Sequence, residues 1–305
     1  RFLARDPPDL DEVRESLRNI VDSDKRAGEI IRRLRAMLRK EPPDFQRLDL
    51  NEVVADVLHI VHSDLITRNV EVRLHLQPDL PATMGDRVQL QRYGAMLLLF
   101  LANCLFWALF EQAGSSLNFL ARDFVDAPFH FTLFQSANPL FILLLAPLFA
   151  LLWPALERGG RNPSIPRKFA IALIGAGSGF LLLALAIGAT PDGARVPWLF
   201  LVLTYLVHTM AELCLSPIGL SMVTKLAARH EVGMAMGGWF LSTAMANYLA
   251  GLIAAVASGG GGHGAASSLV QYAATFTQLW WLALAIGGSC FLCAPLINRL
   301  MHGVK

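Results

Sequence analysis

Two acidic residues lie inside long apolar runs of this 305-residue sequence, and they are the residues most able to do chemistry. Glu111 is the only charged residue within positions 93–121, and Glu212 is the only one within positions 196–224. A charge at the depth of a bilayer costs at least about 2.5 kcal/mol on insertion scales, so it normally faces a water-filled cavity or a partner group. Because such residues mark ion, proton or substrate pathways, we interpret Glu111 and Glu212 as part of such a pathway.

The alternative interpretation of these two acids is structural: each carboxyl stays protonated inside the protein and is only hydrogen-bonded there. The occurrence of two acids in separate runs favours the pathway. Apart from the charged residues that bound the apolar runs, no lysine or arginine occurs within them, so an ionised Glu111 or Glu212 would need a cation from helices outside this chain. A protonated carboxyl would suit a device that carries protons across a membrane.

His208 lies four residues before Glu212, so the two side chains share a helix face. A histidine in this position could relay protons. It could equally be a packed, neutral side chain that donates a hydrogen bond to a backbone carbonyl. The sequence leaves both interpretations open.

The elements that must position these acids are six apolar segments, each long enough to cross a bilayer, which takes about 20 residues. We predict transmembrane helices over residues 94–120, 132–156, 168–189, 197–224, 233–257 and 270–300. Eight of the ten basic residues after position 92 fall in the connections on one side. Because cytoplasmic loops carry the excess of lysine and arginine, we expect a multi-pass protein of the cell (inner) membrane with both termini in the cytoplasm.

Two small motifs inside the spans concern packing and metal binding. The glycines of IGAGSGF (174–180) put small residues on a helix face, which permits close helix approach. Cys290 and Cys293 form a CxxC, but no second pair and no histidine at ligand spacing accompany them. We therefore expect no metal and no cofactor.

The first part of the chain is much richer in charged residues than the rest. Residues 1–92 hold 33 of the 50 acidic and basic side chains. Their pattern predicts a helix over 11–40 and a strand, helix and strand within 47–77, that is, a small truncated α/β segment before the membrane helices. The charge is not spread over one surface, so no nucleic-acid partner is expected. The absence of an initial Met suggests a cut or incomplete chain.

Residues 93–303 resemble the C-terminal half of proton-dependent oligopeptide transporters, which belong to the major facilitator superfamily. The segments that carry the resemblance are FWALFEQAGSSLN (106–118), FQSANPLFILLLAPLFALLW (134–153), PRKFAIALIGAGSGFL (166–181), HTMAELCLSPIGLSMVTKLA (208–227) and GGWFLSTAMANYLAG (237–251). The resemblance implies an all-α membrane protein, half of a major facilitator fold, with an N-terminal six-helix half missing. Its partners would be the lipid bilayer, protons and small peptides.

The resemblance also implies roles for individual residues. Glu111 would pair with basic residues of the N-terminal helices and take part in gating and proton coupling, whereas Glu212 would face the amino terminus of a bound peptide. The residues implied to line the peptide pocket with Glu212 are Trp107, Asn138, Ser216 and Trp239. Spacing supports part of this set, because Trp107 with Glu111, and Glu212 with Ser216, are four residues apart and share a helix face.

Residues 1–91 resemble a truncated sensor histidine kinase, from its dimerisation helix to the start of its ATP-binding domain. The likeness rests on AGEIIRRLRAMLRK (27–40), LDLNEVVADVLHIV (48–61) and LQPDLPATMGDRVQLQ (76–91). The phospho-accepting histidine, the magnesium-binding asparagines and the glycine-rich ATP lid of that family are missing, so no enzyme activity is expected. Both domains are cut at the join near residue 92, which suggests a chimeric gene model.

The sequence therefore leaves two alternative functions. The first is the C-terminal half of a proton-coupled transporter of di- and tripeptides, inactive alone. The alternative is a sensor kinase fragment of a two-component system fused to a membrane segment.

Overall fold

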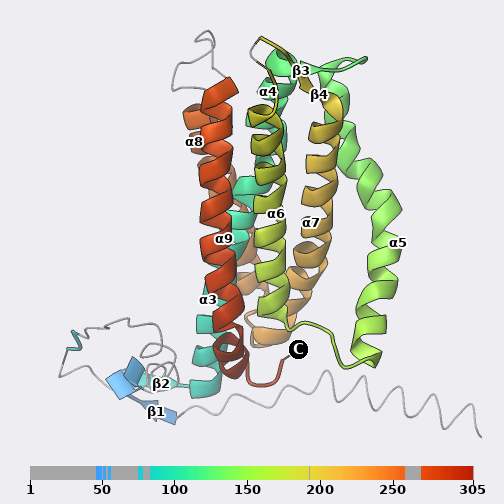
Figure 1. Ribbon diagram of the computed structural model, residues 1–305. Helices are drawn as coiled ribbons and strands as arrows, with labels where there is room; N and C mark the ends of the chain where they lie inside the picture. The colour runs from blue at the N-terminus through green and yellow to red at the C-terminus, as the bar shows by residue number, and fades with distance from the viewer. Residues whose placement is uncertain are drawn as a thin grey trace, which may run out of the picture. The chain divides into compact units, whose positions relative to one another are not determined.

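The apolar spans of the sequence form helices in the computed structural model (Figure 1). The structure describes residues 46–49, 51–52, 54–55, 75–77, 83–191, 193–257 and 269–304. The chain divides into two compact units, Arg1–Asp44 and Phe45–Lys305. The helix predicted over 11–40 lies outside the described residues.

Six helical segments are long and apolar enough to cross a membrane, which confirms the predicted all-α fold with six spans. The first consists of α3 (Arg87–Phe110), the 3₁₀ turn η1 (Glu111–Gly114) and α4 (Ser116–Phe124), and the second of the 3₁₀ turn η2 (Phe131–Ser136) and α5 (Ala137–Arg158). The others are α6 (Ile165–Gly188), α7 (Trp198–Leu226), α8 (Val232–Ala257) and α9 (Leu269–Leu300).

The first span begins earlier than the sequence predicted. Helix α3 starts at Arg87 because the carboxylate of Asp86 accepts a hydrogen bond from the backbone N–H of Gln89 at 3.1 Å and so caps the helix. Gln89 also donates from Nε2 to the carbonyl of Leu226 at 2.9 Å, which ties this first turn to the end of α7. The domain boundary predicted at residues 91 and 92 falls inside α3, and the division between the two compact units lies at Asp44 and Phe45.

The described residues before α3 include one antiparallel pair of strands. β1 (Gln46–Leu48), which overlaps the strand expected from residue 47, pairs with β2 (Thr83–Gly85). Most of the second predicted strand lies outside the described residues, and residues 75–77 at its end have no regular structure. The carbonyl of Gln77 instead accepts a hydrogen bond from Nδ2 of Asn51 at 2.7 Å.

Helix α6 lies between α7 and α9 and packs closely against both (Figure 1). Two glycines of the IGAGSGF motif make this approach possible. A Cβ added at Gly177 would lie 2.6 Å from the Cβ of Ala283 on α9, and one added at Gly179 would lie 2.5 Å from the His208 ring on α7. The packing role expected of the motif is confirmed.

The start of α6 corrects the expectation that the spans contain no cation. Helix α6 begins at Ile165, so Lys168 belongs to its first turns, and its side chain is only 5% exposed. Its ammonium lies 4.3 Å from the centre of the Trp153 ring on α5. This cation–π contact stabilises the ammonium, and the apolar stem of the side chain packs against its neighbours, so the lysine can be buried at this end of the helix bundle.

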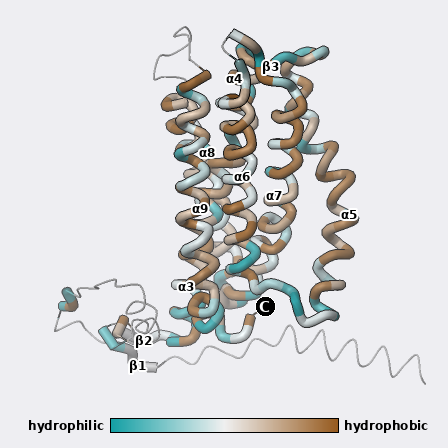
Figure 2. The backbone as a smooth tube through the Cα atoms, viewed as in Figure 1, coloured by the Kyte–Doolittle hydropathy of each residue, from teal (hydrophilic) through white to brown (hydrophobic). Residues whose placement is uncertain are grey.

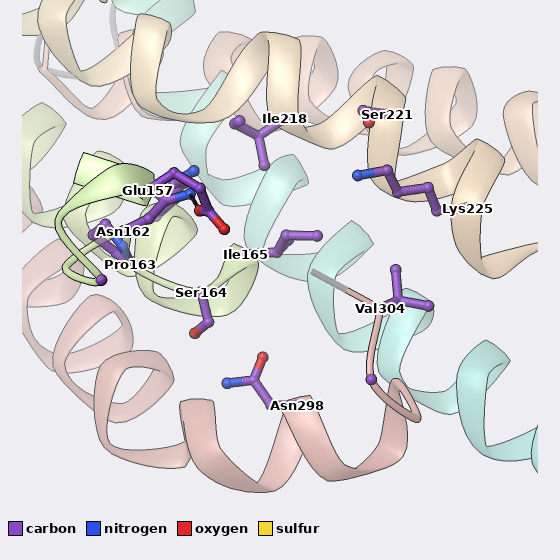
Figure 3. Close-up of a pocket in the computed structure, with 13 residues that line it drawn as sticks. Glu157, Asn162, Pro163, Ser164, Ile165, Ile218, Ser221, Lys225, Asn298 and Val304 are labelled. Carbon is purple, nitrogen blue, oxygen red and sulfur yellow. Dashed lines mark hydrogen bonds between the residues drawn. The ribbon is translucent and has the colours of Figure 1, made fainter. Parts of the chain in front are cut away.

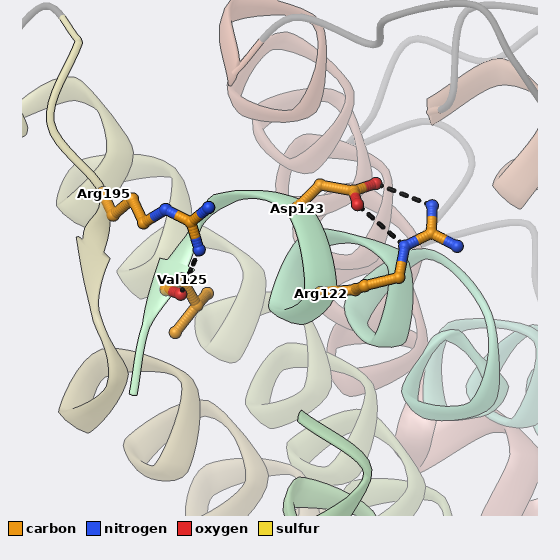
Figure 4. Close-up of polar contacts among 4 residues, drawn as sticks. All are labelled: Arg122, Asp123, Val125 and Arg195. Atoms are coloured by element: carbon orange, nitrogen blue, oxygen red, sulfur yellow. Dashed lines mark hydrogen bonds and ion pairs between the residues drawn. The ribbon is translucent and has the colours of Figure 1, made fainter. Parts of the chain in front are cut away.

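At the other end of the bundle, two connections are joined to each other. The parallel pair consists of β3 (Val125–Asp126) and β4 (Val196–Pro197). Arg195 donates from Nη1 to the carbonyl of Val125 at 3.4 Å, and Arg122 donates to both carboxylate oxygens of Asp123, at 2.7 and 2.9 Å (Figure 4). The strand pair and the Arg195 bond fix the end of α4 beside the start of α7, whereas the Arg122–Asp123 contact lies within α4.

Helix α5 stands at the edge of the bundle, where α7 is its main neighbour among the long helices (Figure 1). Phe141 and Phe149 on one side of α5 pack against the core, but no residue of this helix is buried. The other side exposes Leu140, Leu143, Leu144, Leu148 and Leu151. Hydrophobic residues cover most of the length of the helices, and hydrophilic ones gather at the connections (Figure 2). An apolar outer surface of this kind is what a bilayer requires.

Candidate functional site

The first span is interrupted at the residue expected to carry its chemistry. Helix α3 ends at Phe110, Glu111 opens the 3₁₀ turn η1, and Ser115 leaves the helical region, with φ −123° and ψ −98°. A short 3₁₀ stretch within a helix often marks a functional hinge. Glu111 is half-buried, and no side chain in the part of the chain that the structure describes donates a hydrogen bond to its carboxylate.

Two side chains hold this interruption in place. The buried Gln112 donates from Nε2 to the carbonyls of Ala108, at 3.0 Å, and of Ala250 on α8, at 3.1 Å, while its Oε1 accepts from the hydroxyl of Ser116 at 2.7 Å. From α7, the hydroxyl of Tyr205 donates to the carbonyl of Ala113 at 3.2 Å. The side chain of Gln112 thereby ties the break to α8, and the hydroxyl of Tyr205 ties the Ala113 carbonyl of the break to α7.

Glu212 lies in the middle of α7 and accepts a hydrogen bond at 3.0 Å from Nδ2 of Asn138, the second residue of α5. The same amide nitrogen donates to Oγ1 of Thr209 at 3.1 Å, and Thr209 donates to the carbonyl of Tyr205 at 2.8 Å. Glu212 and Asn138 are both half-buried. The structure thus brings together two residues that the resemblance placed in one site, although they are 74 positions apart.

Glu111 follows the last residue of α3, and α3 packs against α7, the helix that carries Glu212. Two ionised carboxylates on neighbouring helices would repel each other, so a cation or a proton between them would lower the electrostatic energy. The basic residues within the described spans lie toward the helix ends: Arg87, Arg92, Arg122, Arg158, Arg167, Lys168, Lys225 and Arg299. Over the described ranges, neither acid forms an ion pair with any of them.

Trp107 and Ser216 each lie one turn from one of the acids. Trp107, half-buried on α3, meets the ring of Phe110 edge-on at 5.3 Å between centroids. Ser216 is half-buried on α7, four residues after Glu212. Whether these two side chains share one site with the acids stays a prediction.

Trp239 on α8 lies deeper in the packing between helices. Its side chain is 4% exposed, and its ring contacts Phe100 at 5.8 Å and Phe169 at 6.4 Å between centroids. A Cβ added at Gly219 would lie 2.1 Å from this ring, so α7 and α8 approach closely there. Trp239 therefore packs against α3, α6 and α7, one turn of α7 beyond Ser216.

His208 is packed inside the bundle. Its ring is 2% exposed, lies 4.8 Å from the Phe180 ring between centroids, and places Nε2 at 2.9 Å from the carbonyl of Ala176. A carbonyl can only accept, so Nε2 carries the proton. This hydrogen bond favours the packed interpretation of His208 over the relay.

Sequence reasoning did not single out Thr209, Gln112 or Tyr205. Thr209 lies three residues before Glu212, and this spacing could have found it, because residues three apart share a helix face. Gln112 and Tyr205 bond backbone carbonyls of other helices. No local pattern signals such a contact.

Nothing in the described ranges suggests a metal centre. No group of three or more His, Cys, Asp or Glu side chains in those ranges is arranged to hold a metal ion. The four cysteines, including Cys290 and Cys293, are free thiols.

The six apolar helices define an integral membrane protein. Between them lies a polar site with two acids, of which one opens a helix break and the other accepts a hydrogen bond from an asparagine. The family model described as "POT family" matches residues 39–270. The chain belongs to the POT family.

Several characterised proteins resemble the chain. It is 36% identical over 215 residues to the peptide transporter YePEPT of Yersinia enterocolitica, covering 68% of this chain and 41% of the relative. It is 33% identical over 213 residues to dipeptide and tripeptide permease A of Edwardsiella piscicida, covering 68% and 43%. A crystal structure of peptide transporter POT in complex with sulfate matches with a TM-score of 0.63 at 30% identity, over 94% of this chain and 54% of that one.

The chain spans about half the length of the relatives that it matches. The family match begins at residue 39, inside the segment that resembles a sensor kinase. These comparisons give no support to the kinase resemblance of residues 1–91, and residues 39–91 fall within the match to the POT family.

Proposed function

We propose that this chain forms part of a proton-coupled transporter of di- and tripeptides and contributes the helices that carry its acidic site. The observation that carries the proposal is the Glu212 carboxylate on α7, which accepts a hydrogen bond from Asn138 at 3.0 Å. Helix α7 packs against α3, which ends next to Glu111. Membership of the POT family and the names of the relatives support the substrate class.

In this proposal Glu212 binds the amino terminus of the peptide. Asn138 holds one carboxylate oxygen, which fixes the direction of the other. An ammonium group is the natural partner of a carboxylate held in this way, because charge-assisted hydrogen bonds are about twice as strong as neutral ones. Trp107 and Ser216 would line the same pocket. Trp239, which the resemblance also places there, is packed between helices with 4% of its side chain exposed.

Glu111 takes the second role, in gating and proton coupling. It opens the 3₁₀ turn between α3 and α4. A change in the protonation or the ion pairing of Glu111 could therefore change the angle between these two helices. Its cation would come from helices outside this chain, since no described basic residue pairs with it.

We propose further that the chain requires a complementary set of six helices, that it lies in the cell (inner) membrane with both ends in the cytoplasm, and that it does not transport alone. Substrate sites of such carriers form at the interface between two structural halves near the middle of the bilayer. The chain spans about half the length of its relatives, which supports this requirement.

The test is proton-driven uptake of a labelled dipeptide into liposomes. We would reconstitute the chain alone, and together with the part of the Yersinia peptide transporter that it does not match. We expect uptake only from the pair. In the pair, Glu212→Gln should raise KM roughly ten- to hundredfold, because a charge-assisted hydrogen bond is worth about 1.5–3 kcal/mol.

In the same preparation, Glu111→Gln should leave dipeptide exchange intact but remove its response to the pH gradient. The matched control is Glu231→Gln, which removes an acid outside the spans, at the end of the connection before α8, and should change neither quantity. Wild-type kinetics in both Glu212→Gln and Glu111→Gln would remove these residues from the site. Strong uptake by the chain alone would refute the need for a second half.

A further inference from the structure

The Asn138 amide that bonds Glu212 makes a second hydrogen bond to the same helix. Its Nδ2 donates to the Glu212 carboxylate at 3.0 Å and to Oγ1 of Thr209 at 3.1 Å. An amide nitrogen carries two protons, so these two acceptors use both of them. Thr209 is fully buried and lies three residues before Glu212 on α7. One helix therefore presents both acceptors to a single residue of α5.

The direction of the Thr209 hydroxyl determines which end of the amide can face it. The hydroxyl has one proton, and its oxygen lies 2.8 Å from the carbonyl of Tyr205, which can only accept. Toward Asn138, Thr209 therefore offers only lone pairs. An amide oxygen in that place would meet another acceptor, so the amide must turn its nitrogen toward Thr209. The second proton of that nitrogen is then directed at Glu212.

This orientation bears on how Glu212 binds a cation. An asparagine that is free to rotate can donate to an ionised carboxylate through its nitrogen, or accept from a protonated carboxyl through its oxygen. With Thr209 in place, only the first arrangement keeps both hydrogen bonds. A hydrogen bond to the charged form of an acid favours that form, and the charged form is the one that binds an ammonium group.

We propose that Thr209 is a positioning residue of the acidic site: its hydroxyl holds the Asn138 amide in the orientation that donates to Glu212. Thr209 is buried, so it acts through Asn138 and not by touching the peptide. The inference rests on the proposed role of Glu212 as the ligand of a peptide amino terminus. The effect of Thr209 on the Glu212 carboxyl can nevertheless be tested without transport.

Helix α7 offers a matched control for Thr209. Thr204 is also fully buried, and its hydroxyl donates to the carbonyl of Phe200, four residues earlier, at 2.9 Å. Its other bond goes to the carbonyl of Gly179 on α6 at 3.2 Å. A second control is Ser221, further along α7, which lines a separate cavity of about 580 Å³ at the end of the bundle where α6 begins (Figure 3).

The first arm uses the purified full chain in lipid. Dicyclohexylcarbodiimide, an apolar reagent that attacks protonated carboxyls, is added, and peptide mass spectrometry follows the labelling of each acid. We expect Thr209→Val to speed the labelling of Glu212 roughly two- to tenfold, the equivalent of one hydrogen bond, because the freed amide can rotate and accept from the protonated acid. Thr209→Ser should restore the wild-type rate, whereas Thr204→Val and Ser221→Ala should leave it unchanged.

Glu111 is the internal reference of this arm, since its carboxylate accepts from no side chain in the described part of the chain. If Thr209→Val leaves the labelling of Glu212 at the wild-type rate, or speeds Glu111 equally, the positioning role is overturned. Circular dichroism reports the folding of each variant. Thr209→Ala, which removes the same hydroxyl, decides if Thr209→Val unfolds.

The second arm measures dipeptide uptake by the reconstituted pair described above. Thr209→Val should raise KM roughly two- to tenfold with kcat unchanged, and Thr209→Ser should reverse the change. An unchanged KM in a pair that takes up dipeptide would also overturn the positioning role. If the pair takes up no dipeptide while the labelling of Glu212 responds as expected, the proposed function is wrong and the positioning role of Thr209 stands.

Discussion

At the scale of single residues, the two acids differ in how they are held. Glu212 sits inside a continuous helix and its carboxylate is oriented by Asn138. Glu111 sits at a helix break, where its backbone carbonyl accepts from the Ser115 hydroxyl at 3.2 Å. A fixed carboxylate suits the recognition of a ligand, and a carboxylate on a hinge suits a gate. The two roles, which the family resemblance implies, match this difference.

For His208 we predict a role in stability and no role in proton coupling. His208→Leu removes the donor to the carbonyl of Ala176 and should cost about 1–3 kcal/mol of stability. The pH dependence of uptake by the reconstituted pair should not change, because this ring is packed. Thermal unfolding and uptake at several pH values measure the two effects. A shifted pH midpoint with unchanged stability would restore the relay interpretation.

The sequence identified the site only in part at this scale. Glu111 and Glu212 stand out because a charge in an apolar run is visible without any structure. Asn138 was reached only through the family resemblance, since a polar residue near a helix end gives no signal, and its bond to Glu212 spans 74 positions. Local periodicity does not encode such pairings.

At the scale of the elements, the break between α3 and α4 depends on Gln112. Gln112→Ala removes the hydrogen bonds to Ala250 on α8 and to Ser116, so stability should fall by about 1–3 kcal/mol. Thermal unfolding of the purified chain checks this. The control is Gln135→Ala, which changes an exposed amide on η2 and should have little effect. Equal unfolding temperatures for the two variants would show that Gln112 does not hold the break.

The packing of α6 gives a second prediction for an element. Gly179→Ala would place a Cβ 2.5 Å from the His208 ring, and overpacking of this kind costs about 1–3 kcal/mol. Gly188→Ala on the same helix meets nothing within 4 Å and serves as the control. Thermal unfolding should separate the two variants clearly. A Gly179→Ala variant as stable as Gly188→Ala would contradict the close approach of α6 and α7.

The sequence predicted the six spans well, because bilayer thickness imposes a length and a polarity that composition reveals. It missed the start of α3, which the cap at Asp86 sets. It also missed the pairing of β1 with β2, which joins segments about forty residues apart through backbone groups that carry no sequence signature.

At the scale of the whole molecule, the central claim is that the two acids face a water-accessible pathway between helices. The outer side of α5 exposes leucines, as a surface against lipid or other helices requires, while Asn138 on the same helix turns toward α7. The chain therefore has an apolar exterior and a polar interior site, and the remaining wall of the pathway would come from a second half.

The most direct measurement is the accessibility of single cysteines to a membrane-impermeant methanethiosulfonate reagent. A background without Cys104, Cys214, Cys290 and Cys293 is used, with the chain in liposomes. Glu212→Cys and Glu111→Cys should react, and Leu144→Cys, which is 58% exposed on the outer side of α5, should not. If both introduced cysteines are as inert as Leu144→Cys, the acids do not face water, and the account of this protein as part of a transporter is contradicted.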